Sequence, residues 1–529
     1  MVEEHDTNSK TTSSIDFVEK KLDFFAKNTI LSLSIIGFLA LALRLYYFPF
    51  GIPVTLDALN YFWYAMDISL LGHFPASTLA NNGWPTFLSI FFSSFHFNNF
   101  MDYMILQRIV TASISVLTIV PVYLLCNRFF DKPYAIIGAA IFAFEPRIIQ
   151  NSLLGITEPL YVFLGATALF LFLSSNKKMV YSSFGICALL TLVRPEGLFL
   201  FFALSIMFLI QYRKQSKFIA KYALAATIFV LLLLPLITIR IQIMGDDSIT
   251  SRISETISYH VLSTSDKTNG DSGLPFIISG IENLVKFLGW ASIPIFVVFV
   301  PFGAYLILKN RNHETNTMLV TIGIMLIPTV YAFSIISDTR YLFFQYPMWC
   351  VLSLFTVKTV ADKFRKRNIV LILLIGGILL SSSLFLDFKK VDMEHEKEAL
   401  SLSYYVTNTR SGINPYLPES KYLPMPQMID QKFPILSTSI QAGPKLIPTD
   451  GFDSFEEYIK FGREAGLTHL VLDGTDKFYR APFFKDVFFN EEKYPYLTKE
   501  FDSLDHGYKY HLKIYKIDYD KFDSIIKHD

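Results

Sequence analysis

Long apolar stretches separated by short polar ones occupy residues 29–386 of the chain. A helix that crosses a lipid bilayer needs about 20 consecutive, mostly apolar residues. Eleven stretches reach or approach that length, so the pattern predicts eleven membrane-spanning helices. The predicted spans are residues 29–48, 103–125, 133–150, 159–174, 180–194, 197–211, 218–238, 287–308, 317–336, 341–357 and 368–386.

The pattern changes after residue 387. Residues 388–529 are polar, contain no cysteine and are rich in Lys, Asp, Glu and Tyr. Residues 454–465 have helical spacing and precede Gly466, a residue type that commonly ends helices. Residues 509–514 alternate polar and apolar side chains, as a half-buried strand does. These signals predict one small C-terminal α/β domain, for which about 140 residues are enough.

Composition agrees with a membrane protein. Charged residues make up 18% of the chain and hydrophobic residues 52%, whereas a soluble protein has about 25% charged residues. The net charge of +1 argues against nucleic acid as a partner. The cysteines Cys126, Cys187 and Cys350 all lie inside apolar stretches, so the sequence indicates neither a disulfide framework nor a zinc site.

Basic residues in the short loops predict how the chain crosses the membrane, because loops rich in Lys and Arg stay on the cytoplasmic side. If eleven spans alternate, all the basic clusters fall on one side. The sequence thus predicts a retained cytoplasmic segment over residues 1–28 and a transmembrane domain over residues 29–387. The domain over 388–529 is expected outside the cytoplasm, as are the outer loops 49–102 and 239–286.

In this predicted topology, many charged residues lie at the outer ends of spans. Charges at membrane depth are costly, and they usually mark either a functional site or an ion pair. This set comes from loops far apart in the sequence but on one predicted face of the membrane. Its members are Asp57, Glu145, Arg147, Glu158, Arg194, Glu196, Arg240, Asp338 and Arg340.

Asp57 has two compatible interpretations. No Lys or Arg occurs between Tyr46 and Met101, so Asp57 has no basic neighbour in the sequence. It either lies in the first turn of an interfacial helix capped by Thr55, or is a general base that takes a proton from a hydroxyl group. The spacing of the following apolar residues predicts that such a helix turns one face to lipid. The residues of that face are Leu56, Leu59, Phe62, Trp63, Met66 and Leu70.

The other charges also have structural alternatives. Glu145 and Glu158 each precede a proline and could mark helix ends, Arg147 could pair with Glu145, and Arg194 could pair with Glu196. The functional alternative is that arginines hold the phosphate of an anionic lipid while a carboxylate acts as base. A transporter would instead place ionisable residues in the middle of spans, where this chain has almost none.

Five segments carry a family resemblance when they are taken together. In order they read TLDALNYFWYAMDISLLG, FEPRIIQNSLLGITEPLYVFLGATALFLFL, TLVRPEGLFLFF, PLITIRIQIMG and DTRYLFFQYPMW. Over about residues 30–360 the chain resembles the GT-C superfamily of polytopic glycosyltransferases, in the branch of protein O-mannosyltransferases and bacterial aminoarabinose transferases. The resemblance implies an α-helical polytopic fold and an inverting transfer from a polyprenyl- or dolichyl-phosphate sugar.

The resemblance also implies roles for individual residues. The family's catalytic Asp follows the first span, and Asp57 occupies that place. The family's phosphate-binding basic residue matches Arg194 best, with Arg240 and Arg340 as further candidates. Glu158 matches a recurrent polar position, and we group Glu145 and Glu196 with it as supporting polar residues.

The chain departs from the family in two ways that bear on its substrates. Ala58 follows Asp57, where protein O-mannosyltransferases have an Asp-Glu pair, so the acceptor class stays open. The WWDYG motif and the Asp-x-Asp of oligosaccharyltransferases are absent, which disfavours transfer of a whole oligosaccharide. No cofactor or metal is predicted, because Asp246 and Asp247 are better explained as a solvated pair than as a cation site.

The sequence therefore predicts a membrane glycosyltransferase that moves a single hexose, such as mannose, to an acceptor hydroxyl outside the cytoplasm. The acceptor is a protein, a glycan or a lipid, and membrane lipid is the remaining partner. Loop 239–286 is expected to cover the site and the C-terminal domain to help admit the acceptor. A transporter or flippase of lipid-linked intermediates is the alternative.

Overall fold

The computed structural model describes residues 28–526 except 56, 78, 80–81, 248–273, 337, 365–366, 410–451 and 474–481. Segment 1–27 and most of the outer loop 239–286, with their predicted roles, lie outside the described residues. The chain divides into two compact units. The first unit holds residues up to Phe48 and Asn60–Asp387, and the second holds Pro49–Leu59 and the residues from Phe388 onwards. Helices α3 and α18 have residues in both units.

The first unit is built of helices, and each predicted span overlaps one or more of them, although span 133–150 is interrupted at residues 144–145. The helices are α2 (Thr29–Tyr46), α3 (Asp57–Leu71), α4 (Gly83–Ser94), α5 (Phe100–Leu117), α6 (Ile119–Cys126), α7 (Lys132–Ala143), α8 (Pro146–Ser152), α9 (Glu158–Phe172), α10 (Lys177–Val193), α11 (Gly197–Tyr212), α12 (Phe218–Met244), α14 (Leu274–Ser292), α15 (Phe296–Lys309), α16 (His313–Ile335), η2 (Thr339–Gln345), α17 (Tyr346–Ala361) and α18 (Arg367–Thr409).

Several of these helices are long and apolar enough to cross a membrane. Within the described residues there are 5, namely α2, the α5–α6 pair, α12, α16 and residues Ile369–Lys390 of α18. The chain is therefore an integral membrane protein. The predicted span 287–308 needs correction, because the chain bends by 114° between Ser292 and Phe296 and divides it between α14 and α15.

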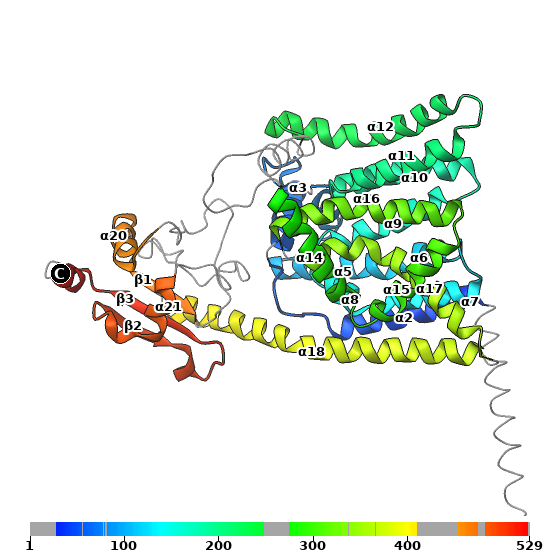
Figure 1. Cartoon of the computed structure of the whole chain (residues 1–529). Helices are drawn as coiled ribbons and strands as arrows, with labels where there is room; N and C mark the ends of the chain where they lie inside the picture. The colour runs from blue at the N-terminus through cyan, green and yellow to red at the C-terminus, as the bar shows by residue number, and fades with distance from the viewer. Residues whose placement is uncertain are drawn as a thin grey trace, which may run out of the picture. The chain divides into compact units, whose positions relative to one another are not determined.

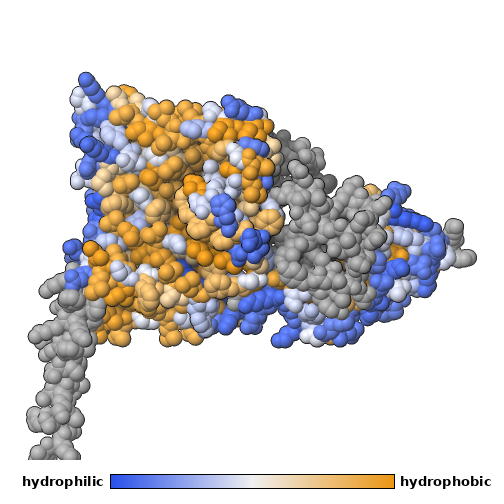
Figure 2. Space-filling view, turned by 180° about the vertical axis from the view of Figure 1, so that it is seen from behind, coloured by the Kyte–Doolittle hydropathy of each residue, from blue (hydrophilic) through white to orange (hydrophobic). Residues whose placement is uncertain are grey.

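The helices pack as a bundle whose outer surface is apolar. Helices α9, α10, α11, α12 and α16 lie side by side with their axes in similar directions (Figure 1). Apolar side chains cover much of the exposed surface of the helical part (Figure 2), and Phe38, Val298 and Leu373 are among the most exposed. An apolar exterior of this kind suits contact with lipid chains.

Close helix contacts occur at glycines, as is typical inside membranes, where close packing drives association. Gly303 of α15 lies against α17, and a Cβ atom at this position would be 1.9 Å from the carbonyl oxygen of Leu352. Gly165 of α9 similarly approaches the Phe344 ring, at 2.3 Å from a would-be Cβ. The absence of side chains at these positions sets the distance between the helices.

The second unit contains a small antiparallel sheet with strand order β1-β3-β2. Its elements are α20 (Phe455–Ala465), β1 (His469–Asp473), α21 (Pro482–Phe489), η5 (Glu491–Lys493), β2 (Leu497–Asp502), η6 (Ser503–His506), β3 (Leu512–Ile517) and α22 (Tyr519–Ile526). The predicted helix and strand are both confirmed. Ser454 caps α20 by accepting from Glu457 N, and Gly466 ends it with a φ of 89°.

One face of the sheet packs on the helices of this unit. Leu470, Leu472 and Tyr515 project from that face into a buried apolar cluster with Tyr458 of α20 and Phe488 of α21. The far end of α18 is attached to the same domain, because the carboxylate of Glu398 accepts hydrogen bonds from the backbone N–H groups of Lys509 (2.6 Å) and Tyr510 (3.2 Å).

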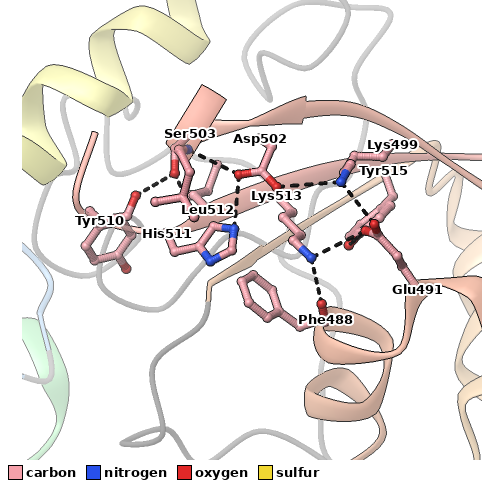
Figure 3. A network of polar contacts seen from close by, with 11 residues as sticks. Phe488, Glu491, Lys499, Asp502, Ser503, Tyr510, His511, Leu512, Lys513 and Tyr515 are labelled. Atoms are coloured by element: carbon pink, nitrogen blue, oxygen red, sulfur yellow. Dashed lines mark hydrogen bonds and ion pairs between the residues drawn. The ribbon is translucent and has the colours of Figure 1, made fainter. Parts of the chain in front are cut away.

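A polar network centred on Glu491 lies beside β2 and β3 (Figure 3). The Glu491 carboxylate accepts hydrogen bonds from Tyr515 Oη at 2.7 Å and Lys499 Nζ at 3.0 Å, and Lys513 Nζ lies 3.4 Å away. Partial burial alone would raise the pKa of Glu491, but the hydrogen bonds from Tyr515 and Lys499 and the charge of Lys513 lower this pKa to about 2.

Gly303→Ala is expected to lower the melting temperature of the purified protein, because the added methyl group must push α15 away from the Leu352 carbonyl. Overpacking of this kind costs about 2 kcal/mol. Gly323→Ala in α16 is the matched control, since no atom lies within 4 Å of its would-be Cβ. Equal melting temperatures for the two variants would show that the α15–α17 contact adjusts freely.

Glu491 makes the stability of the C-terminal domain depend on pH. Its folded pKa of about 2 lies below the unfolded value of about 4.3, so its contribution is complete above the unfolded pKa and is lost as the pH falls towards the folded pKa. Because the side chain is 34% exposed, solvent screening reduces this contribution to about 1 kcal/mol.

Glu491→Gln should therefore increase hydrogen exchange of the β2 and β3 amides about fivefold at neutral pH, the equivalent of about 1 kcal/mol. The difference from the wild type should shrink between pH 4.5 and pH 2 once intrinsic exchange rates are corrected. The neighbouring Glu492→Gln serves as control. An equal effect of both variants, or a constant difference over this pH range, would contradict the assignment.

Candidate functional site

Asp57 is the first residue of α3, and its side chain is exposed. The turn before it is closed by a hydrogen bond from Ala58 N to Thr55 O, at 3.1 Å. A carboxylate at this place lies at the positive end of the helix dipole. The helix start expected from the sequence is present, and the segment that carries Asp57, Pro49–Leu59, belongs to the second unit.

The prediction that α3 turns its aromatic face to lipid is wrong for Phe62 and Met66, whereas Leu70 near the end of the helix is 69% exposed. Phe62 is fully buried and Met66 is 3% exposed. Phe62 packs edge to face against Phe92 of α4 and Phe100 of α5, and Trp63 also contacts the Phe100 ring. Aromatic rings bury large areas and prefer such geometries, so neighbouring helices, rather than lipid, take up this face.

Arg194 is the centre of a charged group in the first unit. It follows α10 directly, and its Nη1 lies 2.6 Å from Glu158 Oε1 at the start of α9. Its Nη2 lies 2.9 Å from Glu196 Oε1. The rings of Tyr341 and Tyr161 lie 5.0 and 5.5 Å from the guanidinium carbon. We call these five residues the Arg194 cluster.

The Arg194 cluster is shielded from solvent, with Arg194 8% and Glu158 4% exposed. The pairing of Arg194 with Glu196 that the sequence left open is therefore present, and Glu158 adds a second carboxylate. Burial strengthens such ion pairs but also makes the loss of one partner costly. Since two carboxylates already neutralise Arg194, an added anion meets less positive charge here than at a singly paired arginine.

Arg240 joins α12 to the first outer loop. Its Nη1 donates to Leu79 O at 2.6 Å, and its Nε donates to Asp246 Oδ1 at 3.1 Å. Arg240 also lines a hollow of about 10 Å³, roughly the room of one water molecule, together with Tyr64 of α3 and Asn82. Arg240 is 6% exposed, whereas its partner Asp246 is 44% exposed.

Arg340 lies in η2 and pairs with Asp338, with 2.5 Å between Nε and Oδ2 and both side chains 27% exposed. Its neighbour in the chain, Tyr341, belongs to the Arg194 cluster, so η2 brings Arg340 close to that cluster. Arg240 makes its contacts elsewhere, on α12 and the loop that contains Leu79.

Glu145 caps a helix instead of joining the arginines. It is fully buried between α7 and α8, and its Oε2 accepts from Ile148 N at 2.9 Å. The guanidinium of Arg147 points elsewhere and donates to Trp290 O at 2.8 Å and Ile293 O at 3.3 Å. The cap explains the Glu-Pro sequence, since proline suits the first turn of a helix.

The structure also contains a buried cation that sequence reasoning missed. Arg44 of α2 has no exposed surface and donates to Ser115 Oγ (2.8 Å), Ser152 Oγ (3.1 Å) and the carbonyl oxygens of Ala40 (3.0 Å) and Ala143 (3.2 Å). The sequence signal that could have revealed it is a single Arg inside an apolar stretch, because a charge at membrane depth usually has a function or a partner. Within the described ranges, no group of three or more His, Cys, Asp or Glu side chains is arranged to hold a metal ion.

Comparison with solved structures shows which fold this is. ArnT from Cupriavidus metallidurans bound to undecaprenyl phosphate matches with a TM-score of 0.55 and 11% identity, over 91% of this chain and 97% of that one. The Archaeoglobus fulgidus oligosaccharyltransferase complexed with Zn and sulfate matches with a TM-score of 0.53 and 16% identity, over 84% and 68%. The chain shares the fold of these two structures.

A further similar structure is AglB from A. fulgidus in complex with an inhibitory peptide and a dolichol-phosphate, with a TM-score of 0.51 and 15% identity over 84% of this chain and 69% of that one. No known family description and no curated protein matches the chain. At these identities the likeness establishes the fold, and it confirms the GT-C resemblance and the helical architecture with a small C-terminal sheet.

Arg194→Ala is expected to destabilise the first unit strongly, because Glu158 then stays buried without its cation. Removing one partner of a buried pair costs about 3 kcal/mol or more, which a fall in melting temperature would reveal. Arg340→Ala is the control, since its more exposed pair is worth about 1 kcal/mol or less.

A second substitution separates lost pairing from lost packing. Adding Glu158→Gln to Arg194→Ala removes the stranded charge and should restore part of the stability. The loss of stability in the double variant is compared with the sum of the losses in Arg194→Ala and Glu158→Gln. If the two are equal, the ion pair is not what holds α9 and α10 together.

Proposed function

We propose that this protein is an inverting membrane glycosyltransferase that uses a lipid-phosphate-linked sugar as donor. The observation that carries the proposal is the match to ArnT, which spans 97% of that chain and 91% of this one. The match extends over most of both chains, so the likeness is one of overall fold and not of a single domain. Fold alone does not imply function, so the site residues must supply the chemistry.

The donor we propose is a polyprenyl- or dolichyl-phosphate sugar. The ArnT structure holds undecaprenyl phosphate and the AglB structure holds a dolichol-phosphate, which are both long-chain lipid phosphates. The helical bundle of this protein has an apolar exterior that suits such a chain, and its arginines suit a phosphate. A hexose such as mannose is the sugar we favour, by resemblance to the protein O-mannosyltransferase branch.

The proposed reaction is a single displacement. Asp57 takes the proton from the acceptor hydroxyl as the hydroxyl oxygen attacks the anomeric carbon of the sugar. The bond between that carbon and the phosphate oxygen breaks, and the lipid phosphate leaves with the bonding electrons. One inverted glycosidic bond forms, and the proton ends on Asp57. The exposed position of Asp57 at the start of α3 supports this role, because an acceptor hydroxyl can reach the carboxylate.

Arginines are proposed to stabilise the departing phosphate. Arg340 pairs with Asp338, which is 27% exposed, and Arg240 pairs with Asp246, which is 44% exposed, whereas one of the two partners of Arg194, Glu158, is only 5% exposed. A phosphate can take the place of the more exposed partners at little cost. Arg194 is held by both Glu158 and Glu196, so we propose that it orients η2 through Tyr341 and that its remaining N–H groups contact the donor.

Several features support transfer of one sugar outside the cytoplasm. The oligosaccharyltransferase motifs are absent from the sequence, and basic loops favour a cytoplasmic N-terminus. The segment Pro49–Leu59 belongs to the same unit as the C-terminal domain, which supports a role for residues 388–529 in admitting an acceptor protein, glycan or lipid. A transferase that extends a lipid-linked or envelope glycan fits the same arrangement.

Asp57→Asn is expected to reduce transfer from a radiolabelled polyprenyl-phosphate mannose by about 10²- to 10⁴-fold, the usual contribution of a general base. Binding of the donor lipid should remain. Asp67→Asn, ten residues further along α3, is the matched control and should retain near-normal turnover. Near-normal activity of Asp57→Asn would leave Asp57 as a helix-start residue only.

A lipid-translocation assay separates the enzyme from a flippase. Wild-type protein in vesicles should transfer the labelled sugar without moving the donor between leaflets. Translocation without transfer, with a panel of polyprenyl-phosphate sugars, would overturn the proposed function.

A further inference from the structure

Helix α14 has an exposed apolar stripe along one side. Its residues Ile277, Ile278, Ile281 and Val285 are exposed by 39%, 46%, 48% and 67%. Successive helical residues turn by about 100° around the axis, so these four side chains lie within a sector of about 100°.

A polar sector adjoins this stripe. Glu282 and Lys286 are both exposed, and the helical turn places them at one edge of the apolar stripe. The other side of α14, with Phe276, Gly280 and Leu284, is buried. Seen along its axis, the helix thus divides into a face towards protein, an exposed apolar face and an exposed polar face.

Contacts with α16 fix the rotation of α14 about its own axis. Ser334 Oγ donates to Phe276 O at 2.8 Å, and Asn283 Nδ2 donates to Phe333 O at 2.9 Å. Gly280 approaches so closely that a Cβ atom would be 2.4 Å from Val330 O. Because the helix cannot turn, the directions of the apolar and polar faces are set by the fold.

The C-terminal end of α14 is held in a sharp bend. A helix leaves its last carbonyl oxygens without internal partners, and here Arg147 donates to Trp290 O and Ile293 O while Tyr346 Oη donates to Ala291 O at 2.8 Å. The chain then turns by 114° into α15. With these carbonyl oxygens satisfied, α14 can end at the edge of the apolar layer and run in a direction different from that of α15 (Figure 1).

We propose that α14 lies along the surface of the bilayer, with Ile277, Ile278, Ile281 and Val285 inserted among the acyl chains of one leaflet. Glu282 and Lys286 then face headgroups and water. A helix that dipped into the membrane as a re-entrant segment would bury both charges in hydrocarbon, which is unfavourable. Trp290, 57% exposed at the end of the helix, fits the preference of Trp for the interface. The proposal depends on the chain being a membrane protein and not on its enzymatic activity.

Site-directed spin labelling tests this arrangement on the full chain. The three native cysteines are buried, so a single introduced cysteine takes the label. Val285→Cys and Ile281→Cys report on the apolar face, and Lys286→Cys and Glu282→Cys are their matched neighbours on the polar face. The labelled proteins are reconstituted into vesicles of phosphatidylcholine and phosphatidylglycerol, and collision rates with oxygen and with a water-soluble nickel chelate are measured.

At positions 281 and 285 oxygen collisions should exceed nickel collisions, as in lipid, and at positions 282 and 286 this order should reverse. Two outcomes would overturn the proposal. Low nickel access at all four positions would indicate a re-entrant helix, whereas low access to both reagents at 281 and 285 would indicate that protein covers the stripe. Sugar-transfer activity is measured on the same samples. Its presence or absence tests the proposed function and does not change the conclusion about α14.

Discussion

Backbone hydrogen bonding at helix breaks is the constraint on which the helical unit depends. Lipid offers no partners to free N–H and C=O groups, so a membrane protein can interrupt a helix only where other groups of the protein satisfy the backbone. Between α7 and α8 these groups are Arg44, which donates to Ala143 O, and Ser382, which donates to Phe144 O. Between α14 and α15 they are Arg147 and Tyr346. Between α8 and α9, Gln107 donates to Gly155 O at 2.6 Å.

These breaks explain why charged residues gather at helix ends. Glu145 and Glu158 each stand at a helix start followed by proline, and Arg194 and Arg240 stand near helix ends. Some of these charges form hydrogen bonds with the backbone. Glu145 accepts from Ile148 N, and Arg147 donates to a carbonyl oxygen at the end of α14. Others pair with carboxylates, Arg194 in a buried cluster and Arg340 in a half-buried pair. A glycosyltransferase site can be built from the second group without disturbing the first, because the two groups have different hydrogen-bond partners.

The C-terminal domain is held together by different means. Its sheet packs one face against α20, α21 and α22 through a conventional apolar cluster, and its polar edge is organised by the Glu491 network with Lys499, Lys513 and Tyr515. Glu398 attaches α18 to this domain through backbone N–H groups. Helix α18 is continuous from Arg367 to Thr409 and has residues in both units.

The sequence by itself determined the helical class, the positions of the apolar spans, the start of α3 at Asp57 and the helix and strand of the C-terminal domain. These features depend on local periodicity and on turn residues, which are present in any short window of the chain. Tertiary structure alone decided that Phe62 packs on Phe92 and Phe100 and not on lipid, that Glu158 shares Arg194 with Glu196, and that span 287–308 is broken at residue 292. An apolar residue facing lipid and one facing a neighbouring helix look alike in a sequence. Which of the two it is depends on partners tens of residues away, and only the folded chain brings them together.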